Sequence, residues 1–200
     1  MNTKISTFIF DCFGVVCSPA VNGWYRENRL NRGLIDENLP IVLKQFDLGE
    51  LTEVDIAEYF SEYRGVTKKP DEIRAEIDSY LNTDSRVVDI IRHLKGNGFK
   101  VALMSNANNS FFERVIYPRY PFFKDLFDKI IISSVVGMVK PDADIYLYAL
   151  AELKSRPEET LFIDDSVTNV DAAKALGMNG HLFTTSQSLV TFLERNKINL

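Results

Sequence analysis

Four short runs of β-branched, aliphatic and aromatic residues stand out along the chain, and each ends abruptly in polar side chains. Their apolarity is continuous rather than alternating, which is typical of strands buried on both faces of a parallel sheet. The runs are Thr7–Phe10, Lys100–Met104, Ile130–Ile132 and Leu161–Ile163. We therefore predict core strands at these four positions.

Between these runs, apolar residues recur at helical spacing. Residues 87–94 form one apolar stripe, and the glycines that follow it are suited to end a helix. Further stripes lie within residues 142–154 and 167–176. Strands that alternate with helices over short connections predict an α/β fold with a doubly wound parallel sheet.

The stretch 18–82 breaks this alternation, because it contains helical signals but no convincing strand. A capping box that begins at Thr52 and a proline at position 70 mark the starts of two helices. We expect this stretch to be a helical cap inserted after the first strand. The predicted organisation is a core formed by residues 1–17 and 83–200, with the cap between them.

Composition and charge exclude several classes of function. The 200 residues include 28 acidic and 23 basic side chains, and a net charge of −5 argues against nucleic-acid or anionic-membrane partners. Two histidines are too few for a histidine metal cluster, and the two cysteines do not form a CxxC motif. Asp11 interrupts the apolar N-terminal stretch, which argues against a secretory signal, and no window is apolar enough for a transmembrane helix. We expect a cytoplasmic protein with reduced thiols.

The polar residues at the ends of the runs carry the candidate chemistry. Ligands of an open parallel sheet bind beyond the carboxyl ends of its strands, so these residues are expected to converge on one crevice. In chain order they are Asp11, Ser105 with Asn106, Lys140, and Asp164 with Asp165. A carboxylate nucleophile, a hydroxyl, an ammonium group and an acidic pair suit phosphoryl transfer to an aspartate, with Mg²⁺ joining carboxylate and phosphate oxygens. Taken singly, each residue also suits an ordinary role as a cap, a turn residue or a solvated surface group.

Four segments resemble the motifs of the haloacid dehalogenase-like superfamily. They are Phe8–Val16, Leu103–Asn106, Gly137–Pro141 and Phe162–Ser166. The likeness covers nearly the whole chain, and the helical insertion lies where members with a small helical cap and a Rossmannoid core carry it. The chain is most similar to the bacterial glucose-1-phosphate phosphatases and to the N-terminal phosphatase domain of soluble epoxide hydrolase.

The resemblance implies a nucleophile and a metal site. Asp11 is expected to attack phosphorus and to form an aspartyl-phosphate. Mg²⁺ is expected to bind the side chains of Asp11 and Asp165 and the backbone carbonyl of Phe13. Asp164 is expected to support this cluster from close by.

The resemblance also implies a set of phosphate-binding groups. The phosphoryl group is expected to contact the Ser105 hydroxyl, the backbone N–H of Asn106 and the Lys140 ammonium. Asn169 occupies a position where many relatives have aspartate, and we expect it to position these groups or a metal-bound water.

The residue two positions after the expected nucleophile departs from the superfamily pattern. Most of its phosphatases have a second aspartate there, which protonates the leaving oxygen and then activates water. Phe13 cannot transfer a proton, and a positioned acid/base group typically contributes about 10²–10⁴-fold in rate. Its backbone carbonyl remains, so metal and phosphate binding are compatible with the phenylalanine.

Three interpretations follow from this departure. The first is a Mg²⁺-dependent phosphatase of a small phosphorylated metabolite, with an anomeric sugar phosphate as a candidate because its acidic leaving group depends less on a proton donor. The second is a binding or regulatory protein whose chemistry has decayed. The third is a 2-haloacid dehalogenase, which works without metal and therefore has no need of the acidic pair. We favour the phosphatase, because the other motif residues are all present.

The cap is expected to determine the substrate, but its sequence does not specify which residues reach the crevice. Trp24, Tyr25 and Arg26 follow the first motif closely and are candidates for substrate contact. No coiled-coil or interface stripe marks an oligomer, so monomer and homodimer both remain open.

Overall fold

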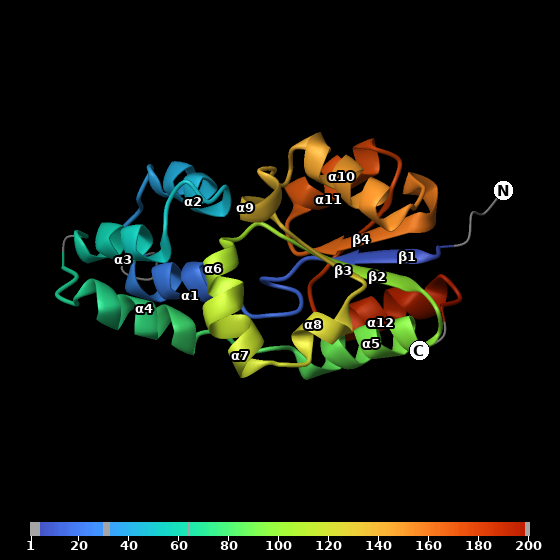
Figure 1. Ribbon diagram of the computed structural model, residues 1–200, viewed down its shortest axis with the longest axis horizontal. Helices are drawn as coiled ribbons and strands as arrows, with labels where there is room; N and C mark the ends of the chain where they lie inside the picture. The colour runs from blue at the N-terminus through green and yellow to red at the C-terminus, as the bar shows by residue number, and fades with distance from the viewer. Residues whose placement is uncertain (1–4, 30–32, 64, 199–200) are drawn as a thin grey trace.

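The strands predicted from the apolar runs form one parallel sheet. The structure is a computed structural model that describes residues 5–29, 33–63 and 65–198. The few remaining positions of the predicted core and cap lie outside the described residues. The strands are β1 (Thr7–Phe10), β2 (Lys100–Ser105), β3 (Lys129–Ile132), β4 (Thr160–Asp164) and β5 (Asn179–Leu182). Their spatial order is β3-β2-β1-β4-β5, and every pair is parallel, which confirms the predicted α/β fold (Figure 1).

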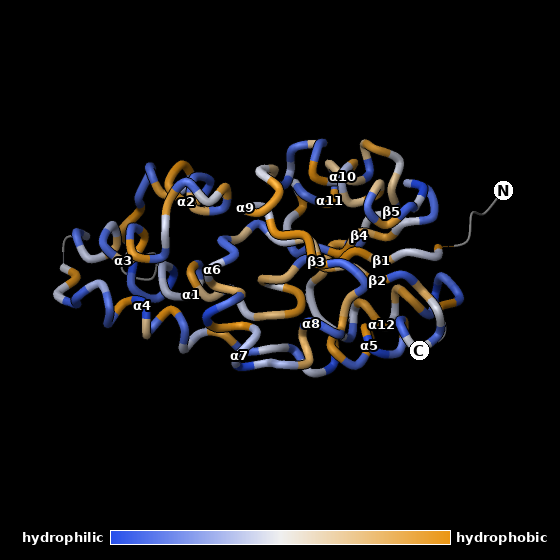
Figure 2. The backbone as a smooth tube through the Cα atoms, viewed as in Figure 1, coloured by the Kyte–Doolittle hydropathy of each residue, from blue (hydrophilic) through white to orange (hydrophobic). Residues whose placement is uncertain are grey.

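Helices cover both faces of the sheet. The helices on one face are α10 (Ala143–Leu153) and α11 (Val167–Ala175), and those on the other are α5 (Ser85–Gly96), α8 (Phe123–Leu126) and α12 (Ser186–Arg195) (Figure 1). Successive side chains of β1 point to opposite faces, so Ile9 packs with the first group, whereas Phe8 and Phe10 pack with the second. Figure 2 shows the helices alternating between hydrophobic and hydrophilic residues along their turns, as amphipathic helices do.

Several short elements connect the strands. They are α6 (Asn109–Phe111), the π-helix η2 (Phe112–Ile116), α7 (Tyr117–Arg119), α9 (Ser133–Val136) and the 3₁₀ helix η3 (Pro157–Glu159). The aromatic rings of η2 and α8 pack together beneath the sheet, and the centroids of Phe112 and Phe123 are 6.2 Å apart. This segment therefore contributes mainly to the core.

The stretch 18–82 contains helices, as expected. These inserted helices are α1 (Ala20–Asn28), α2 (Leu39–Asp47), α3 (Glu53–Ser61) and α4 (Pro70–Ser79). They lie beyond the carboxyl ends of the strands, on the left of Figure 1. The predicted capping box is present at α3, where Thr52 Oγ1 accepts from the Asp55 N–H at 3.2 Å and Asp55 Oδ2 accepts from the Thr52 N–H at 2.7 Å. Among the described helices, none is both long and apolar enough to span a bilayer.

The inserted segment leaves and re-enters the core at adjacent points. The Ser18 N–H donates to the Asn82 carbonyl at 2.8 Å, and the Asn82 N–H donates to Ser18 Oγ at 2.8 Å. Cys17 and Thr83 form an isolated antiparallel bridge beside this contact. The two connections to the inserted helices therefore run side by side.

Candidate active site

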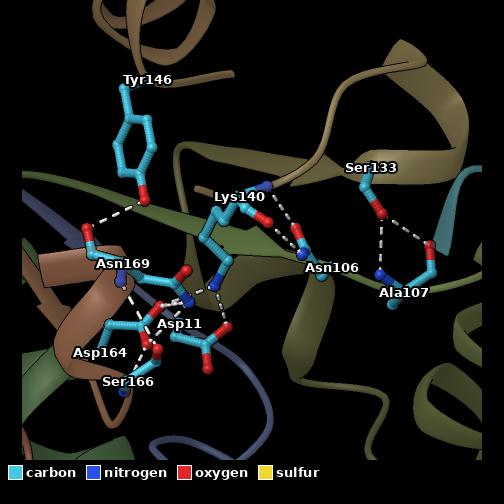
Figure 3. A network of polar contacts seen from close by, with 9 residues as sticks. All are labelled: Asp11, Asn106, Ala107, Ser133, Lys140, Tyr146, Asp164, Ser166 and Asn169. Atoms are coloured by element: carbon cyan, nitrogen blue, oxygen red, sulfur yellow. Dashed lines mark hydrogen bonds and ion pairs between the residues drawn. The ribbon is translucent and has the colours of Figure 1, made fainter. Parts of the chain in front are cut away.

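Two carboxylates lie close together because β1 and β4 are adjacent parallel strands. Asp11 follows β1 directly and donates its backbone N–H to the Ile163 carbonyl at 2.8 Å, whereas Asp164 is the last residue of β4. The Lys140 ammonium, from the loop after α9, donates to Asp11 Oδ1 at 2.5 Å and to Asp164 Oδ2 at 2.8 Å (Figure 3). Asp11, Asp164 and Lys140 are all buried. The structure thus brings together three groups that the sequence predicted to converge.

The site carries more negative charge than Lys140 can balance. Carboxylate oxygens of Asp11, Asp164 and Asp165 lie within 4.8 Å of one another. Burial raises the pKa of Asp11 to about 7, an effect that Lys140 opposes and the charge of Asp164 reinforces. Desolvation and the Asp164 charge also raise the pKa of Asp165. Closely spaced carboxylate oxygens with surplus negative charge are the ligands that Mg²⁺ prefers, so these residues fit the expected ion.

The Asp164 carboxylate already has several protein partners. It accepts hydrogen bonds from Lys140 Nζ, from the Ser166 N–H at 2.8 Å and from Asn169 Nδ2, which is 3.1 Å from each oxygen. The Tyr146 hydroxyl donates to the Asn169 carbonyl at 3.0 Å (Figure 3). Asp164 therefore contacts both Lys140 and the first turn of α11, and the supporting role of Asp164 and Asn169 stays a prediction.

Ser105 and Asn106 bring β2 to the same site. Ser105 is fully buried, and its hydroxyl has no hydrogen-bond partner among the described residues. The Asn106 side chain accepts from the Lys140 N–H at 2.8 Å and donates to the Lys140 carbonyl at 2.9 Å. This two-way contact fixes the lysine loop against β2, a positioning role that the sequence did not reveal.

The loop after β1 carries Phe13 into the site. Its ring packs against Phe111 and Phe112, with centroids 5.9 Å and 6.2 Å away. The next residue, Gly14, has a φ of +103°, and a Cβ atom there would overlap the Asp165 carboxylate. Only glycine satisfies both the backbone conformation and this close approach.

A cavity of about 250 Å³ lies between the strand ends and the inserted helices. Its charged end is formed by Asp11, Lys140 and Asp165, with Asn106 beside them. The inserted segment contributes apolar wall residues and one acidic residue. They include Val21, Leu43, Phe46 and Asp47.

The expectation for residues 24–26 is corrected by this cavity, because none of the three lines it. Trp24 is fully buried among the inserted helices, where it stacks on Phe60 with centroids 4.8 Å apart. Its indole N–H donates to Glu76 Oε2 at 2.9 Å. Proximity in sequence to the first motif did not reveal that the first turn of α1, rather than its middle, faces the crevice.

The residues that dock α2 beside the cavity were also missed. Ser133 Oγ accepts from the Ala107 N–H at 2.9 Å and donates to the Asp47 carbonyl at 2.5 Å. Asn108 Nδ2 donates to the Leu51 carbonyl at 2.9 Å. The only sequence signal for Ser133 was its place at the end of the third apolar run, where a polar residue can have many roles.

A family model described as haloacid dehalogenase-like hydrolase matches residues 5–177. The chain belongs to the haloacid dehalogenase-like hydrolase family. The match includes strands β1 to β4, the inserted helices and all the carboxylates of the site. The resemblance identified from the four motifs is therefore confirmed, and the protein is an enzyme of this family.

Relatives of this haloacid dehalogenase-like hydrolase include a named phosphatase. The chain is 31% identical over 178 residues to the sesquiterpene phosphatase astK of Aspergillus oryzae, across 80% of this chain and 88% of the relative. It is 32% identical over 104 residues to bifunctional epoxide hydrolase 2 of Rattus norvegicus, across 51% of this chain and 19% of that protein. The HAD family enzyme bt-2542 of Bacteroides thetaiotaomicron, solved with magnesium and inorganic phosphate, matches with a TM-score of 0.70 and 23% identity, across 90% of this chain and 94% of that chain. This last likeness shows the common fold.

Proposed function

We propose that this enzyme is a Mg²⁺-dependent phosphatase, which hydrolyses a small phosphorylated metabolite through an aspartyl-phosphate on Asp11. The observation that carries the proposal is the contact of Asp11 with Lys140 at the charged end of the cavity, beside Asp164 and Asp165. The sesquiterpene phosphatase among its relatives supports phosphate ester hydrolysis. The neighbouring enzyme solved with magnesium and inorganic phosphate supports the choice of ion.

The proposed metal site uses the surplus negative charge of the carboxylates. We expect the side chains of Asp11 and Asp165 and the Phe13 carbonyl to hold Mg²⁺, which would neutralise and orient phosphate oxygens. Asp164 supports the site through its bonds to Lys140 and Asn169.

The protein side chains and backbone supply the nucleophile and the groups that bind the phosphate. An Asp11 oxygen forms a bond to phosphorus while the bond from phosphorus to the leaving oxygen breaks. Lys140 favours the ionised, nucleophilic form of Asp11, which burial alone would disfavour. Lys140 and the unpartnered Ser105 hydroxyl, with the Asn106 N–H, stabilise the charge on the phosphoryl oxygens. Water then attacks the aspartyl-phosphate, which releases inorganic phosphate and restores the carboxylate.

The proposed substrate is a compact organic phosphate, because the cavity measures about 250 Å³. An anomeric sugar phosphate remains a candidate, since its leaving group is more acidic than an ordinary alcohol. We propose that residues 18–82 act as a cap over the core at 1–17 and 83–200, and that the enzyme works in the cytoplasm as a monomer or homodimer. A metal-free dehalogenase is disfavoured because it has no use for three clustered carboxylates.

Replacing Asp11 by Asn tests the proposal, because the amide keeps the shape of the side chain and removes the nucleophile. With Mg²⁺, the wild-type enzyme is expected to release phosphate from an aryl phosphate and from a preferred member of a panel of anomeric and terminal sugar phosphates. Asp11→Asn and chelation by EDTA are each expected to lower this rate by about 10³-fold or more. Asp171→Asn is a matched control, because this carboxylate is exposed and its ion-pair partner among the described residues, Lys174, is 3.8 Å away. Wild-type inertness on the whole panel, or metal-free chloride release from a 2-chloroacid, would contradict the proposal.

A further inference from the structure

The proposed chemistry lacks a proton donor at the usual position. The leaving oxygen must gain a proton in the first step, and water must lose one in the second. Phe13 can do neither, and its ring is packed against Phe111 and Phe112. This inference rests on the proposed function and concerns the group that supplies that proton.

Few titratable side chains can reach a substrate in the cavity. Within the described residues, those that line it are Asp11, Asp47, Lys140 and Asp165. Asp11 is the proposed nucleophile, Lys140 is paired with Asp11 and Asp164, and Asp165 belongs to the carboxylate cluster. Asp47 is the remaining acid, and it comes from the inserted helices rather than from the sheet.

The backbone of Asp47 is fixed while its carboxylate is left free. Its carbonyl accepts the Ser133 hydroxyl at 2.5 Å, which ties the last residue of α2 to the end of β3. Gly49 then turns the chain with a φ of +80°, and a Cβ there would come within 3.1 Å of Ser134 Cβ. Among the described residues, no hydrogen bond or ion pair engages the Asp47 carboxylate, so it is available to a ligand.

The surroundings of Asp47 allow its carboxyl group to act both as a proton donor and as a proton acceptor. Burial in the cavity wall raises its pKa to about 7, an effect that Lys140 opposes and Asp11 reinforces. A group with this pKa can be protonated when it must donate and ionised when it must accept at neutral pH.

We propose that Asp47 is the acid/base catalyst of this enzyme and takes the place of the aspartate that Phe13 has replaced. In the first step Asp11 bonds to phosphorus, the bond to the leaving oxygen breaks, and that oxygen takes the proton of Asp47. The products are an alcohol, the aspartyl-phosphate and an ionised Asp47. In the second step Asp47 takes a proton from water as the water oxygen bonds to phosphorus and the bond to Asp11 breaks. Inorganic phosphate leaves, and Asp47 is again protonated.

A leaving-group series with the variant Asp47→Asn tests this role. The kcat/KM for alkyl phosphates, which need a proton donor, is expected to fall by about 10²–10⁴-fold. The kcat/KM for 4-nitrophenyl and 2,4-dinitrophenyl phosphate is expected to fall far less, because these phenolates leave without a proton. With the nitrophenyl esters, slow hydrolysis of the aspartyl-phosphate should produce a burst of phenol. If Asp47 had only a structural role, its replacement would lower kcat/KM equally for alkyl and nitrophenyl phosphates and would produce no burst of phenol.

Three further variants separate chemistry from folding. Asp47→Glu retains an acid and is expected to recover part of the alkyl phosphatase rate. Phe13→Asp in the Asp47→Asn background restores a carboxyl at the usual position and is expected to recover alkyl phosphate turnover. Glu50→Gln, at an exposed position on the same turn, is the matched control and should change neither class of substrate.

The outcomes distinguish the two proposals. If Asp11→Asn abolishes turnover but Asp47→Asn leaves alkyl phosphates unaffected, or slows alkyl and nitrophenyl esters alike, the role of Asp47 is overturned and the proposed function stands. If the wild-type enzyme hydrolyses none of the esters, both fail. Selective loss of alkyl phosphate turnover in Asp47→Asn, with recovery by Phe13→Asp, supports the proposal.

Discussion

Lys140 is the residue on which the charge balance of the site depends. Although burial disfavours its charge, Asp11 and Asp164 raise the pKa of its ammonium above the usual range. Moving three charged groups out of water is costly, and the cost is offset only while each has its partners. The lysine therefore stabilises the folded site as well as serving the proposed chemistry.

Replacing Lys140 by Met should expose this dependence. In the presence of EDTA, we expect the free energy of unfolding to fall by about 3–5 kcal/mol, because the buried carboxylates lose their counter-charge. Added Mg²⁺ should recover part of the loss, since an ion that binds only the folded state stabilises it. Urea denaturation with and without the ion measures both effects. Lys174→Met, at an exposed lysine, is the control, and equal midpoints for Lys140→Met and wild type in EDTA would contradict the expectation.

The site residues differ in how far the sequence could predict them. Asp11 and Asp164 could be placed together because the carboxyl ends of neighbouring parallel strands meet, and Lys140 could be placed with them because the connection after the third strand leaves from the same edge of the sheet. Asp47 and Ser133 could not, because their place depends on how α2 docks against the sheet. Apolar spacing identifies the buried face of a helix but not the point at which its last turn meets another element.

The secondary structure elements also differ in how far the sequence could predict them. Strands β1 and β4 are buried throughout, β2 at all but its first residue and β3 at its last two, and this burial on both faces leaves a continuous apolar signal. Strand β5 has no fully buried residue and contains Asn179, Gly180 and His181, so its sequence carries little of that signal. Helix α3 was predictable at its first turn, because Thr52 and Asp55 satisfy each other's backbone N–H groups.

Removal of the Thr52 hydroxyl should weaken α3 measurably. For Thr52→Ala we expect the free energy of unfolding to fall by about 1 kcal/mol, because the Asp55 N–H loses its acceptor at the start of the helix. Urea unfolding followed by Trp24 fluorescence reports on this region, since Trp24 is the single tryptophan and lies among the inserted helices. Thr191→Ala, within α12, provides a matched control whose unfolding should change little. A stability equal to wild type in Thr52→Ala would contradict the capping argument.

Across the whole molecule, Arg114 joins the inserted helices to the core. From η2 it donates Nε to Glu53 Oε2 at 3.0 Å and Nη1 to Asp78 Oδ2 at 2.6 Å. Glu53 begins α3 and Asp78 lies near the end of α4, so one guanidinium contacts both helices. Arg119 adds bonds to the Asp78 and Leu81 carbonyls, each at 2.9 Å. These contacts attach α3 and α4 to the core, and α4 and α3 in turn pack against α1 and α2, the helices that contribute residues to the cavity wall.

The variant Arg114→Met should loosen this attachment while keeping the length of the side chain. The ion pairs are partly exposed, so we expect the free energy of unfolding to fall by about 1 kcal/mol. Compared with the wild-type enzyme, the rate of amide hydrogen exchange should rise more in α3 and α4 than in the sheet. Arg156→Met removes an exposed ion pair elsewhere and serves as the control. Unchanged exchange in α3 and α4 would contradict this function of Arg114.

The paired hydrogen bonds between Ser18 and Asn82 have an evolutionary meaning. Because the chain departs and returns at almost one point, a different stretch of polypeptide with similarly close ends can occupy this position without altering strand order. One recombination event at this point can therefore replace the inserted helices and leave the proposed nucleophile, Asp11, in place.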